Sequence, residues 1–543
     1  MSAAGDSARG TRGMITSPHA VATQAGVDVL AAGGNAVEAA IATVAALCVT
    51  YPHFCGLGGD AFLIVANAQG DVQTISGIGQ AAQDVSGYQS SGSAIPVRGP
   101  RSALTSAGTV DALSQAFEMG RTLKASAQLG GTRSWESLLA PAVRLAREGF
   151  EWTESARFWM DFRQQQAHTM PDIFAAFGLN GAAPRAGHVC QQPQLAETLE
   201  TLAVRGPRDF YEGQLATRLA KGLADAGSPL RSADLAATRA RIEPPLRMDY
   251  RGGTLLAHQP PTQGLTTLQI MGVLQRFDLA SVAEGSADYY HLLVEAVKRA
   301  FIDRNAHVAD PDYVQLPAHL LSGAHLNSLA ASIHMNKALP WPHVFQTGDT
   351  VYVGAADAAG NAVSMLATVY FDWGSGVMAG DTGVLWHNRG ASFSLDPQHP
   401  NALAAGKRPF HTLNPGMYLK HGKPAILYGT QGADGQPQTL AAVLTRLIDY
   451  GMDPMQALAR PRFLLGKTFS DTNDSLKMED DVPQAVLQDL EARGHQVSRV
   501  GAQSPLMGHP GAIVLDPVSG HMTGAHDPRS DGVAIGVTSG VTR

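Results

Sequence analysis

The chain has 543 residues, of which 16% are charged and 44% hydrophobic, and its formal net charge is −7 at pH 7. Because nucleic-acid recognition needs a concentrated basic surface, this charge and the lack of any dense Lys/Arg run argue against a nucleic-acid partner. Cys48, Cys55 and Cys190 are too few for a disulfide framework, and without a CxxC pair they do not indicate a zinc site.

The sequence carries no signal for secretion or for a membrane span. Residues 1–13 lack the apolar core of a signal peptide. The longest apolar run, residues 36–51, contains Glu38 and is shorter than the roughly 20 residues that cross a bilayer. We therefore expect a cytoplasmic protein without membrane contact, and the length alone suggests several domains.

The first half of the chain is expected to be mostly helical. Apolar residues at helical spacing predict a helix over residues 19–32, which Gly33 and Gly34 end. Asn35 is expected to cap a second helix over residues 36–49, whose apolar residues on all sides are typical of a helix buried against a sheet. Strands are expected at residues 61–67, 72–76 and 251–257. Further helices are expected at residues 138–148, 152–168, 194–204, 214–226 and 286–305.

A glycine-rich loop, Gly56-Leu-Gly-Gly59, precedes the first of these strands. It lacks the Lys-Ser/Thr pair of a phosphate-binding P-loop, and a helix rather than a strand comes before it. We expect these glycines to allow a close approach of backbone, with His53 and Asp60 as structural supports of the loop.

The second half has the character of a sheet protein. Two short apolar runs, residues 350–356 and 362–369, are joined by turn residues, which predicts a β-hairpin. Further strands are expected at residues 380–386, 417–420, 425–429, 511–515 and 522–525, and helices at 438–450 and 483–493. Because helices follow buried strands without a Pro/Ser-rich break, we expect one large layered domain.

Several short motifs follow one another in the order found in a known family. They are Gly33-Gly-Asn-Ala-Val37, Pro52-His53 with Gly56-Leu-Gly-Gly59, Asp357-Ala-Ala-Gly-Asn-Ala-Val363, Gly374-Ser-Gly376, Lys407-Arg-Pro409, Tyr450-Gly451, Arg460-Pro-Arg-Phe463 and Asp527-Pro-Arg529. In this order they resemble the gamma-glutamyltransferase (glutathione hydrolase) family of N-terminal nucleophile hydrolases. The resemblance is strongest to the bacterial branch that includes oxamate amidohydrolases.

This resemblance implies an α+β fold with four layers, αββα, in which helices enclose two antiparallel sheets. It implies a proenzyme that cuts itself between Asp349 and Thr350, into a large segment (1–349) and a small segment (350–543) of one domain. The two fragments would form a heterodimer, or a dimer of heterodimers. The resemblance implies no metal and no organic cofactor.

Thr350 is the nucleophile that the resemblance implies. A hydroxyl is a weak nucleophile, but the α-amine that cleavage frees on the same residue has a pKa of about 7.7–8.0 and can take its proton. In self-cleavage the Thr350 hydroxyl would attack the carbonyl of Asp349, and the resulting ester would be hydrolysed. Taken without the resemblance, the local pattern favours the alternative that Thr350 is an ordinary β-branched strand residue.

Three further positions match the catalytic centre of the family. Thr368 matches a second threonine that steadies the nucleophile by hydrogen bonding. Gly432 and Ala433 match a backbone pair that forms the oxyanion hole, and since backbone N–H groups do this work, alanine can replace glycine there. The alternatives are a strand threonine and a strand-ending turn.

The positions that read the γ-glutamyl group in the glutathione enzymes have changed. The arginine that reads the α-carboxylate falls near Ile78, and the acid that reads the α-amine falls on Ser392. A pair of serines falls on His411 and Thr412. Asparagine and glutamine contacts fall on Tyr370 and Arg389.

Two arginines could bind the carboxylate of a substrate instead. Arg389 is the better candidate, because its planar guanidinium can hold a carboxylate with two hydrogen bonds, and a structural ion pair is its alternative. Arg98 is a weaker candidate. His411 could hydrogen-bond a substrate, although a lone histidine is more often structural.

Together these residues predict a self-cleaving amidohydrolase or acyltransferase that acts on a small-molecule amide, γ-glutamyl or related, through an acyl-Thr350 intermediate. A hydrolase of a small carboxylate-bearing amide such as oxamate, or a cephalosporin-type acylase, is the alternative among enzymes. An unprocessed binding protein with the same fold is the alternative from another class.

Overall fold

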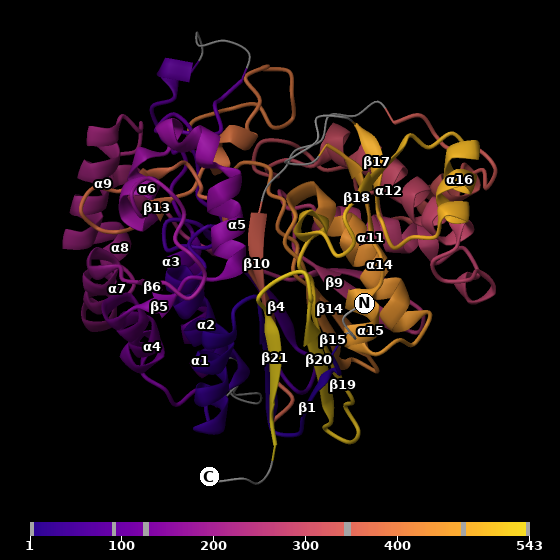
Figure 1. The fold of residues 1–543 in the computed structure, drawn as a ribbon, viewed down its shortest axis with the longest axis horizontal. Helices are drawn as coiled ribbons and strands as arrows, with labels where there is room; N and C mark the ends of the chain where they lie inside the picture. The colour runs from indigo at the N-terminus through magenta and orange to yellow at the C-terminus, as the bar shows by residue number, and fades with distance from the viewer. Residues whose placement is uncertain (1–4, 89–93, 123–129, 342–348, 468–473, 539–543) are drawn as a thin grey trace.

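We describe the protein from a computed structural model, in which residues 5–88, 94–122, 130–341, 349–467 and 474–538 are described. Two seven-stranded antiparallel sheets lie between two layers of helices (Figure 1). The sheet that holds Thr350, called the nucleophile sheet, has the order β21 (Val533–Val537), β2 (Gly13–Ser17), β10 (Asp349–Asp357), β11 (Ala362–Tyr370), β3 (Asp60–Ala66), β4 (Val72–Gly77) and β7 (Arg241–Glu243). The opposite sheet has the order β1 (Ala8–Gly10), β20 (Met522–His526), β19 (Gly511–Leu515), β15 (Lys423–Gly429), β14 (Gly416–Lys420), β9 (Gly253–Ala257) and β8 (Leu246–Tyr250).

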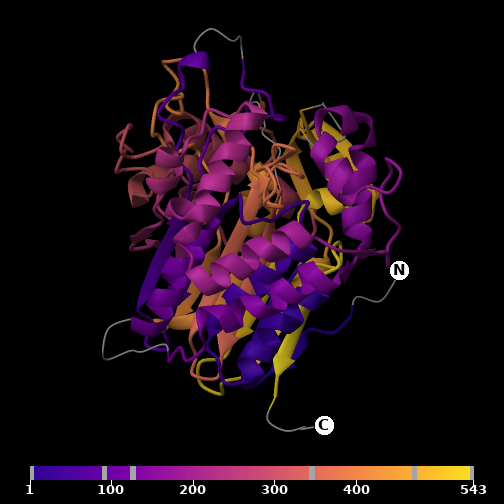
Figure 2. The same cartoon turned by 90° about the vertical axis from the view of Figure 1, so that its left-hand side faces the viewer.

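Helices from the first half of the chain form the layer over the nucleophile sheet, and Figure 2 shows this layer from outside. They are α1 (Ala20–Ala31), α2 (Ala36–Thr50), α3 (Thr109–Thr122), α4 (Trp135–Glu148), α5 (Glu154–Phe162), α6 (Pro171–Phe177), α7 (Pro193–Arg205), α8 (Asp209–Glu212), α9 (Gln214–Ala226) and α10 (Ser232–Ala236). The layer over the opposite sheet contains α11 (Gly264–Leu274), α12 (Ala287–His307), α13 (Gly323–Ala331), α14 (Gln436–Ile448), α15 (Pro454–Ala459) and α16 (Gln484–Ala492). Short strands lie outside the two sheets: β5 (Phe150–Glu151), β6 (Val189–Cys190), β12 (Val377–Met378), β13 (Leu385–Trp386), β16 (Phe463–Gly466), β17 (Ser475–Glu479) and β18 (Val497–Val500).

The alternation of side chains along β10 explains why its apolar run is continuous. Val351 and Val353 face the helix layer and pack in the same cluster as α1 and α2. Tyr352 and Ala356 face the other way and pack in the clusters between the two sheets. Because successive side chains of a strand point to opposite faces, a strand covered on both sides needs apolar residues at every position.

The predicted hairpin is confirmed as β10 and β11, and its turn is fastened to α2. The Asp357 carboxylate accepts hydrogen bonds from the N–H groups of Ala359 (2.9 Å) and Asn361 (3.0 Å) in the turn. Its second oxygen accepts from Ala36 N–H at 3.0 Å, which satisfies an N–H group of the first turn of α2. Two motifs far apart in the sequence are therefore in direct contact.

Asn35 caps α2 as predicted. Its side chain accepts from Glu38 N–H at 2.8 Å, and the Glu38 carboxylate accepts from Asn35 N–H at 2.9 Å. This reciprocal capping box uses the one charge of the apolar helix.

One predicted strand is wrong. Residues 380–386 contain only β13, Leu385–Trp386, at their end. Gly380 and Gly383 have φ angles of 63° and 68°, in a region that strands do not use, so the chain turns here. The short strands β1, β2 and β21 were not predicted from the sequence. Of these, β2 pairs with β10 and β21 pairs with β2, so both belong to the nucleophile sheet.

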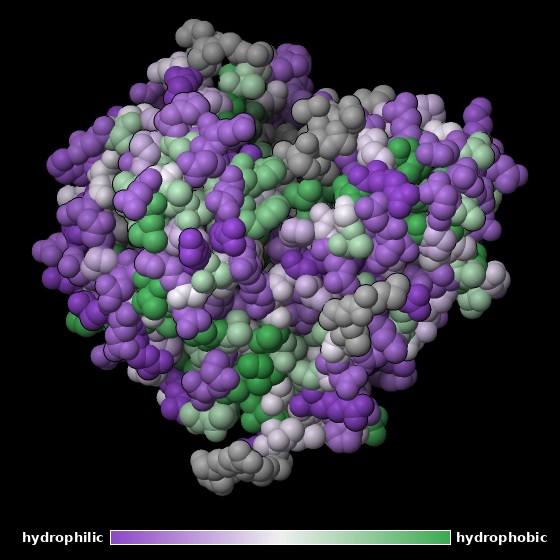
Figure 3. Space-filling view, in the orientation of Figure 1, coloured by the Kyte–Doolittle hydropathy of each residue, from purple (hydrophilic) through white to green (hydrophobic). Residues whose placement is uncertain are grey.

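In the orientation of Figure 1 the surface is largely hydrophilic, and its hydrophobic residues are most frequent along the middle, between the two halves (Figure 3). Among the helices of the described ranges, none combines the length and the apolar content that a membrane crossing requires.

Candidate active site

Thr350 is the second residue of β10, in the interior of the nucleophile sheet, and only 2% of its surface is exposed. The pairing with β11 shifts register here, because Asp349 lies opposite Tyr370 whereas Val351 lies opposite Ala367. Such irregularities re-aim side chains and are frequent beside active sites. The Thr350 hydroxyl donates to Oγ1 of Thr368 at 3.4 Å, so the structure brings these two predicted residues together.

Thr368 is itself held by the backbone around it. Its Oγ1 accepts from the N–H of Tyr370 at 2.8 Å. On the other side, a Cβ placed on Gly59 would lie only 2.0 Å from the carbonyl oxygen of Thr368. The expected close approach of backbone at the glycine-rich loop is confirmed, and what it approaches is the residue that contacts Thr350.

Gly432 and Ala433 form a tight corner between β15 and α14. Their φ angles are 121° and 45°, and an alanine in the left-handed region costs about 1–3 kcal/mol. The carbonyl oxygen of Gln431, in the peptide group that carries the Gly432 N–H, accepts from Thr430 Oγ1 at 2.7 Å. The carbonyl oxygen of Gly432, in the peptide group that carries the Ala433 N–H, accepts from Gly435 N–H at 2.7 Å. Both peptide planes are therefore fixed through their oxygens.

The two N–H groups of this corner remain available. Among the described residues, neither the N–H of Gly432 nor that of Ala433 has a recorded acceptor. The corner also precedes the N-terminus of α14 (Gln436–Ile448), where the helix dipole favours negative charge. The arrangement suits the stabilisation of an oxyanion.

Arg389 is completely buried and only partly bonded. Its guanidinium carbon lies 3.6 Å from the centre of the Tyr370 ring, and Nη1 donates to Oγ1 of Thr412 at 3.4 Å. Nε and Nη2 have no hydrogen-bond partner in the part of the chain that the structure describes. Because Tyr370 pairs with Asp349 across the sheet, this cation lies beside the start of β10.

The charge of Arg389 persists at neutral pH. Burial lowers its pKa to about 10, although Tyr370, Asp60 and Asp434 oppose that shift through space. Neither carboxylate is hydrogen-bonded or ion-paired to it. A buried cation with two unused donors on one planar group has the chemistry to hold a carboxylate, and carboxylate binding by Arg389 stays a prediction.

His411 is engaged within the protein. Its Nε2 donates to the Asp60 carboxylate at 3.1 Å, and its Nδ1 accepts from the N–H of Leu413 at 3.3 Å. Burial, aided by Arg389, lowers the pKa of His411 to about 3, so the ring is neutral. Contact of His411 with a substrate stays a prediction.

The expected support role of Asp60 needs a correction. Its carboxylate accepts from the N–H groups of Gly79 (3.0 Å) and Gly108 (3.1 Å), so it fastens these two loops and His411 rather than the glycine-rich loop itself. Burial raises the pKa of Asp60, but the neighbouring His387, the hydrogen bond from His411 and the charge of Arg389 outweigh this, and the pKa is lowered. His53 accepts from Trp373 N–H through its carbonyl at 2.8 Å.

Ser392 and Arg98 have different surroundings. Ser392 lines a cavity of about 240 Å³ that also reaches Asp434, next to the Gly432–Ala433 corner. Arg98 donates to the carbonyl oxygens of Asp372 (2.6 Å) and Gly374 (2.5 Å), and so holds the loop after β11. Substrate binding by either residue stays a prediction.

Two glutamines of the site had no prediction. Gln436 donates from Nε2 to Oγ1 of Thr350 at 3.4 Å, and its Oε1 accepts from Asn414 N–H at 3.2 Å. Gln263, before α11, donates to the carbonyl oxygens of Thr412 and Ala433. Gln436 lies three residues after Ala433, so its closeness to the predicted oxyanion pair could have indicated a place in the site. The residues around Gln263 in the sequence give no such indication.

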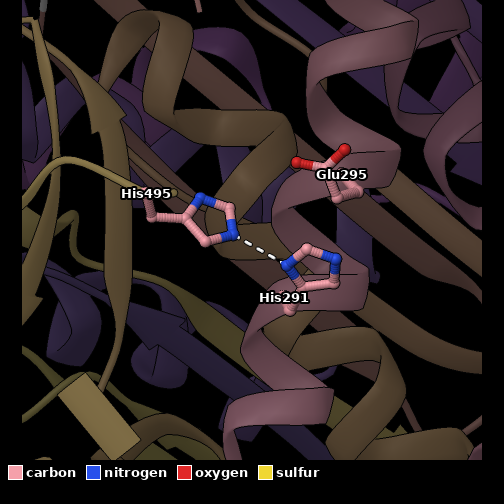
Figure 4. Close-up of side chains that lie close together, drawn as sticks. All are labelled: His291, Glu295 and His495. Carbon is pink, nitrogen blue, oxygen red and sulfur yellow. Dashed lines mark hydrogen bonds between the residues drawn. The ribbon is translucent and has the colours of Figure 1, made fainter. Parts of the chain in front are cut away.

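A second group of titratable residues, His291, Glu295 and His495, lies on α12 and in the loop after α16 (Figure 4). The imidazoles are 2.8 Å apart between Nδ1 of His291 and Nε2 of His495, and Nε2 of His291 lies 3.0 Å from the carbonyl oxygen of His334.

The Glu295 carboxylate is neutralised by its own helix, through Lys298 at 2.9 Å and Arg299 at 2.7 Å. A metal ion would have to displace these cations and break the bond between the imidazoles. The donor set therefore favours a structural role.

Comparisons with known proteins agree with this geometry. The sequence matches the Gamma-glutamyltranspeptidase family over residues 22–537. The chain is 42% identical over 528 residues to the oxamate amidohydrolase proenzyme of Klebsiella pneumoniae, covering 97% of this chain and 98% of that protein. It is 31% identical over 550 residues to the glutathione hydrolase proenzyme of Escherichia coli, covering 96% and 91%. The crystal structure of cephalosporin acylase from Bacillus halodurans superimposes with a TM-score of 0.89 at 31% identity, covering 98% and 97%.

A buried threonine near the start of an inner strand, in a sheet sandwich enclosed by helices, defines an N-terminal nucleophile hydrolase. The chain belongs to the gamma-glutamyltranspeptidase family, in which it is an amidohydrolase proenzyme. The predicted family, αββα fold and hydrolase class are confirmed.

Proposed function

We propose that the chain cuts itself between Asp349 and Thr350 and then hydrolyses a small amide that carries a carboxylate, with oxamate as the reference substrate. The observation that carries this proposal is Arg389, a buried cation with two unused donors beside the start of β10. The similarity to the Klebsiella oxamate amidohydrolase supports the same choice.

Self-cleavage begins with the hydroxyl of Thr350. Its oxygen attacks the carbonyl carbon of Asp349, and the peptide nitrogen leaves as the α-amine of Thr350. Water then hydrolyses the ester, which yields the carboxylate of Asp349 and the free hydroxyl of Thr350. The contacts of Thr350 with Thr368 and Gln436 hold the hydroxyl for this attack.

Substrate hydrolysis uses the products of that cleavage. The neutral α-amine of Thr350 takes the hydroxyl proton as the oxygen attacks the amide carbon of the substrate. The N–H groups of Gly432 and Ala433 bind the oxyanion, and the amine returns the proton to the leaving nitrogen. Water releases the acyl group by the same steps, while Arg389 holds the carboxylate of the substrate.

The two fragments are proposed to remain one body. In the nucleophile sheet, β10 of the small segment lies between β2 of the large segment and β11, and β11 pairs in turn with β3 of the large segment. Separation would break these strand pairs, so the product is a heterodimer, alone or as a dimer of heterodimers. We also propose a cytoplasmic location, in which the three buried free cysteines stay reduced.

Intact mass and a substrate panel test the proposal. We expect two fragments, the smaller beginning at Thr350, and a single chain of 57.0 kDa for Thr350→Ala. Oxamate should be hydrolysed faster than a γ-glutamyl anilide or a cephalosporin-type amide. A wild-type chain that stays whole would refute the cleavage, and a dominant γ-glutamyl activity would refute the substrate class while leaving the nucleophile in place.

A further inference from the structure

Gln263 joins the two ends of the candidate site with one amide group. It is completely buried in the loop that leads into α11. Its Nε2 donates to the carbonyl oxygen of Thr412 at 2.6 Å and to that of Ala433 at 2.7 Å. Thr412 is the hydrogen-bond partner of Arg389, and Ala433 belongs to the oxyanion corner.

Arg304 of α12 determines which way this amide points. Its Nη1 donates to Oε1 of Gln263 at 3.0 Å. The same guanidinium holds both oxygens of Asp434, at 2.9 and 3.3 Å. With a cation on Oε1, the NH₂ group of Gln263 must face the two carbonyl groups. Arg304 therefore holds the residue after Ala433 directly and Ala433 itself through Gln263.

The backbone reinforces the same link. Gln263 N–H donates to the carbonyl oxygen of His411 at 3.0 Å, and the N–H of His411 donates to that of Pro261 at 2.9 Å. The segment with His411 and Thr412 is thereby paired with the loop of Gln263. Because a buried amide with all its partners is rigid, the distance between Thr412 and Ala433 is fixed.

We propose that Gln263, oriented by Arg304, is a positioning residue that sets the spacing between the carboxylate site at Arg389 and the oxyanion corner. This inference rests on the proposed function. A small amide presents its carboxylate and its reacting carbonyl a few atoms apart, so both ends must be correctly placed at once. Misplacement by about 1 Å can cost ~10²-fold in rate.

Gln263→Ala and Gln263→Glu test the amide, since glutamate keeps the size and the acceptor but cannot donate to the two carbonyl groups when ionised. Gln269→Ala is the matched control, because Gln269 is buried in α11, the helix that Gln263 precedes, but bonds Asp303 and the carbonyl oxygen of Leu320. Rates should be normalised to the cleaved fraction, measured by intact mass.

The decisive measurement compares oxamate with oxamide, its neutral analogue. We expect both Gln263 variants to lower kcat/KM for oxamate by about 10²-fold and for oxamide by clearly less, because only oxamate uses both ends of the site. Gln269→Ala should stay within about threefold of wild type for both substrates. Equal losses for both substrates in the Gln263 variants, or no loss, would overturn the inference.

Arg304→Lys and Arg304→Gln test the orientation. Lysine keeps one charged donor for Oε1 and should recover part of the oxamate preference, whereas glutamine should behave like Gln263→Ala. Arg299→Lys, on the same helix but paired with Glu295, should leave the preference unchanged. If Lys and Gln at position 304 give the same preference as wild type, Arg304 does not orient the amide. Failure of the proposed function itself appears separately, as activity that survives in Thr350→Ala.

Discussion

The candidate site has two parts, one for bond cleavage and one for substrate selection, and different kinds of groups form them. At the bond-breaking end, Thr350, Thr368 and the Gly432–Ala433 corner are positioned by strand register and by fixed peptide planes. At the end proposed to select the substrate, the groups are side chains such as Arg389 and Ser392, on a short turn outside the two sheets. Backbone geometry tolerates many sequences, whereas a side-chain pocket changes with each substitution. This difference explains how one catalytic apparatus can serve several substrates in one family.

The largest expected effect is at the nucleophile. Thr350→Ala should abolish self-cleavage and lower amide hydrolysis on the order of 10⁴-fold or more, because the proposed attacking oxygen is removed. Thr350→Ser keeps the hydroxyl and should still cleave. Fragment masses and initial rates measure both, and a Thr350→Ala protein that forms the two fragments would contradict the assignment.

Arg389 is the strongest test of the substrate-choosing end. Arg389→Met should lower kcat/KM for oxamate by about 10²–10³-fold, since the carboxylate loses a buried charged partner. Unfolding of the ligand-free protein should not become easier, because a buried cation without a bonded carboxylate is removed. Kinetics and thermal unfolding check the pair of effects; a loss of stability with unchanged kinetics would make Arg389 structural.

The two ends should also respond differently to pH. The α-amine of Thr350 must be neutral to act as a base, so with a pKa of about 7.7–8.0 the rate should fall about 40-fold from pH 8 to pH 6. His411 stays neutral and Arg389 charged over this range, because their pKa values are about 3 and about 10. We therefore expect kcat to fall while KM for oxamate stays nearly constant. A KM that rises in parallel would show that the substrate-choosing end titrates too.

Gly59→Ala tests the support beneath Thr368. The added Cβ would meet the carbonyl oxygen of Thr368, so the free energy of unfolding should fall by about 1–3 kcal/mol and kcat should fall with it. Gly87→Ala is the control, because a Cβ there meets nothing within 4 Å. Denaturant unfolding of both variants measures the difference, and equal stability would mean that the loop can yield.

The smallest expected effect is at Gln436. Loss of its hydrogen bond to Thr350 should lower kcat by about three- to tenfold in Gln436→Ala, in line with one neutral hydrogen bond. Gln438→Ala, on the same helix but bonded to backbone carbonyls of Asp434 and Leu465, is the comparison. Equal kinetics in the two variants would remove Gln436 from the catalytic centre.

Local sequence predicted much of the scaffold, because local forces build it. The hairpin around Asp357 and the cap of α2 by Asn35 depend on neighbouring residues and were predicted correctly. The strand expected at residues 380–386 was wrong because two glycines turn the chain there. β21 was not predicted, and its pairing with β2, which joins opposite ends of the chain, is not visible in local sequence.

For this protein, the sequence by itself determined the family, the layered fold and the position of the threonine, because motif order and apolar patterning are written along the chain. Only the tertiary structure decided how those residues are used. It engaged His411 with Asp60, left two donors of Arg389 unbonded in the interior, and placed Gln263 between Thr412 and Ala433. Whether a buried polar atom has a hydrogen-bond partner depends on residues up to hundreds of positions away in the sequence, and sequence spacing does not identify them.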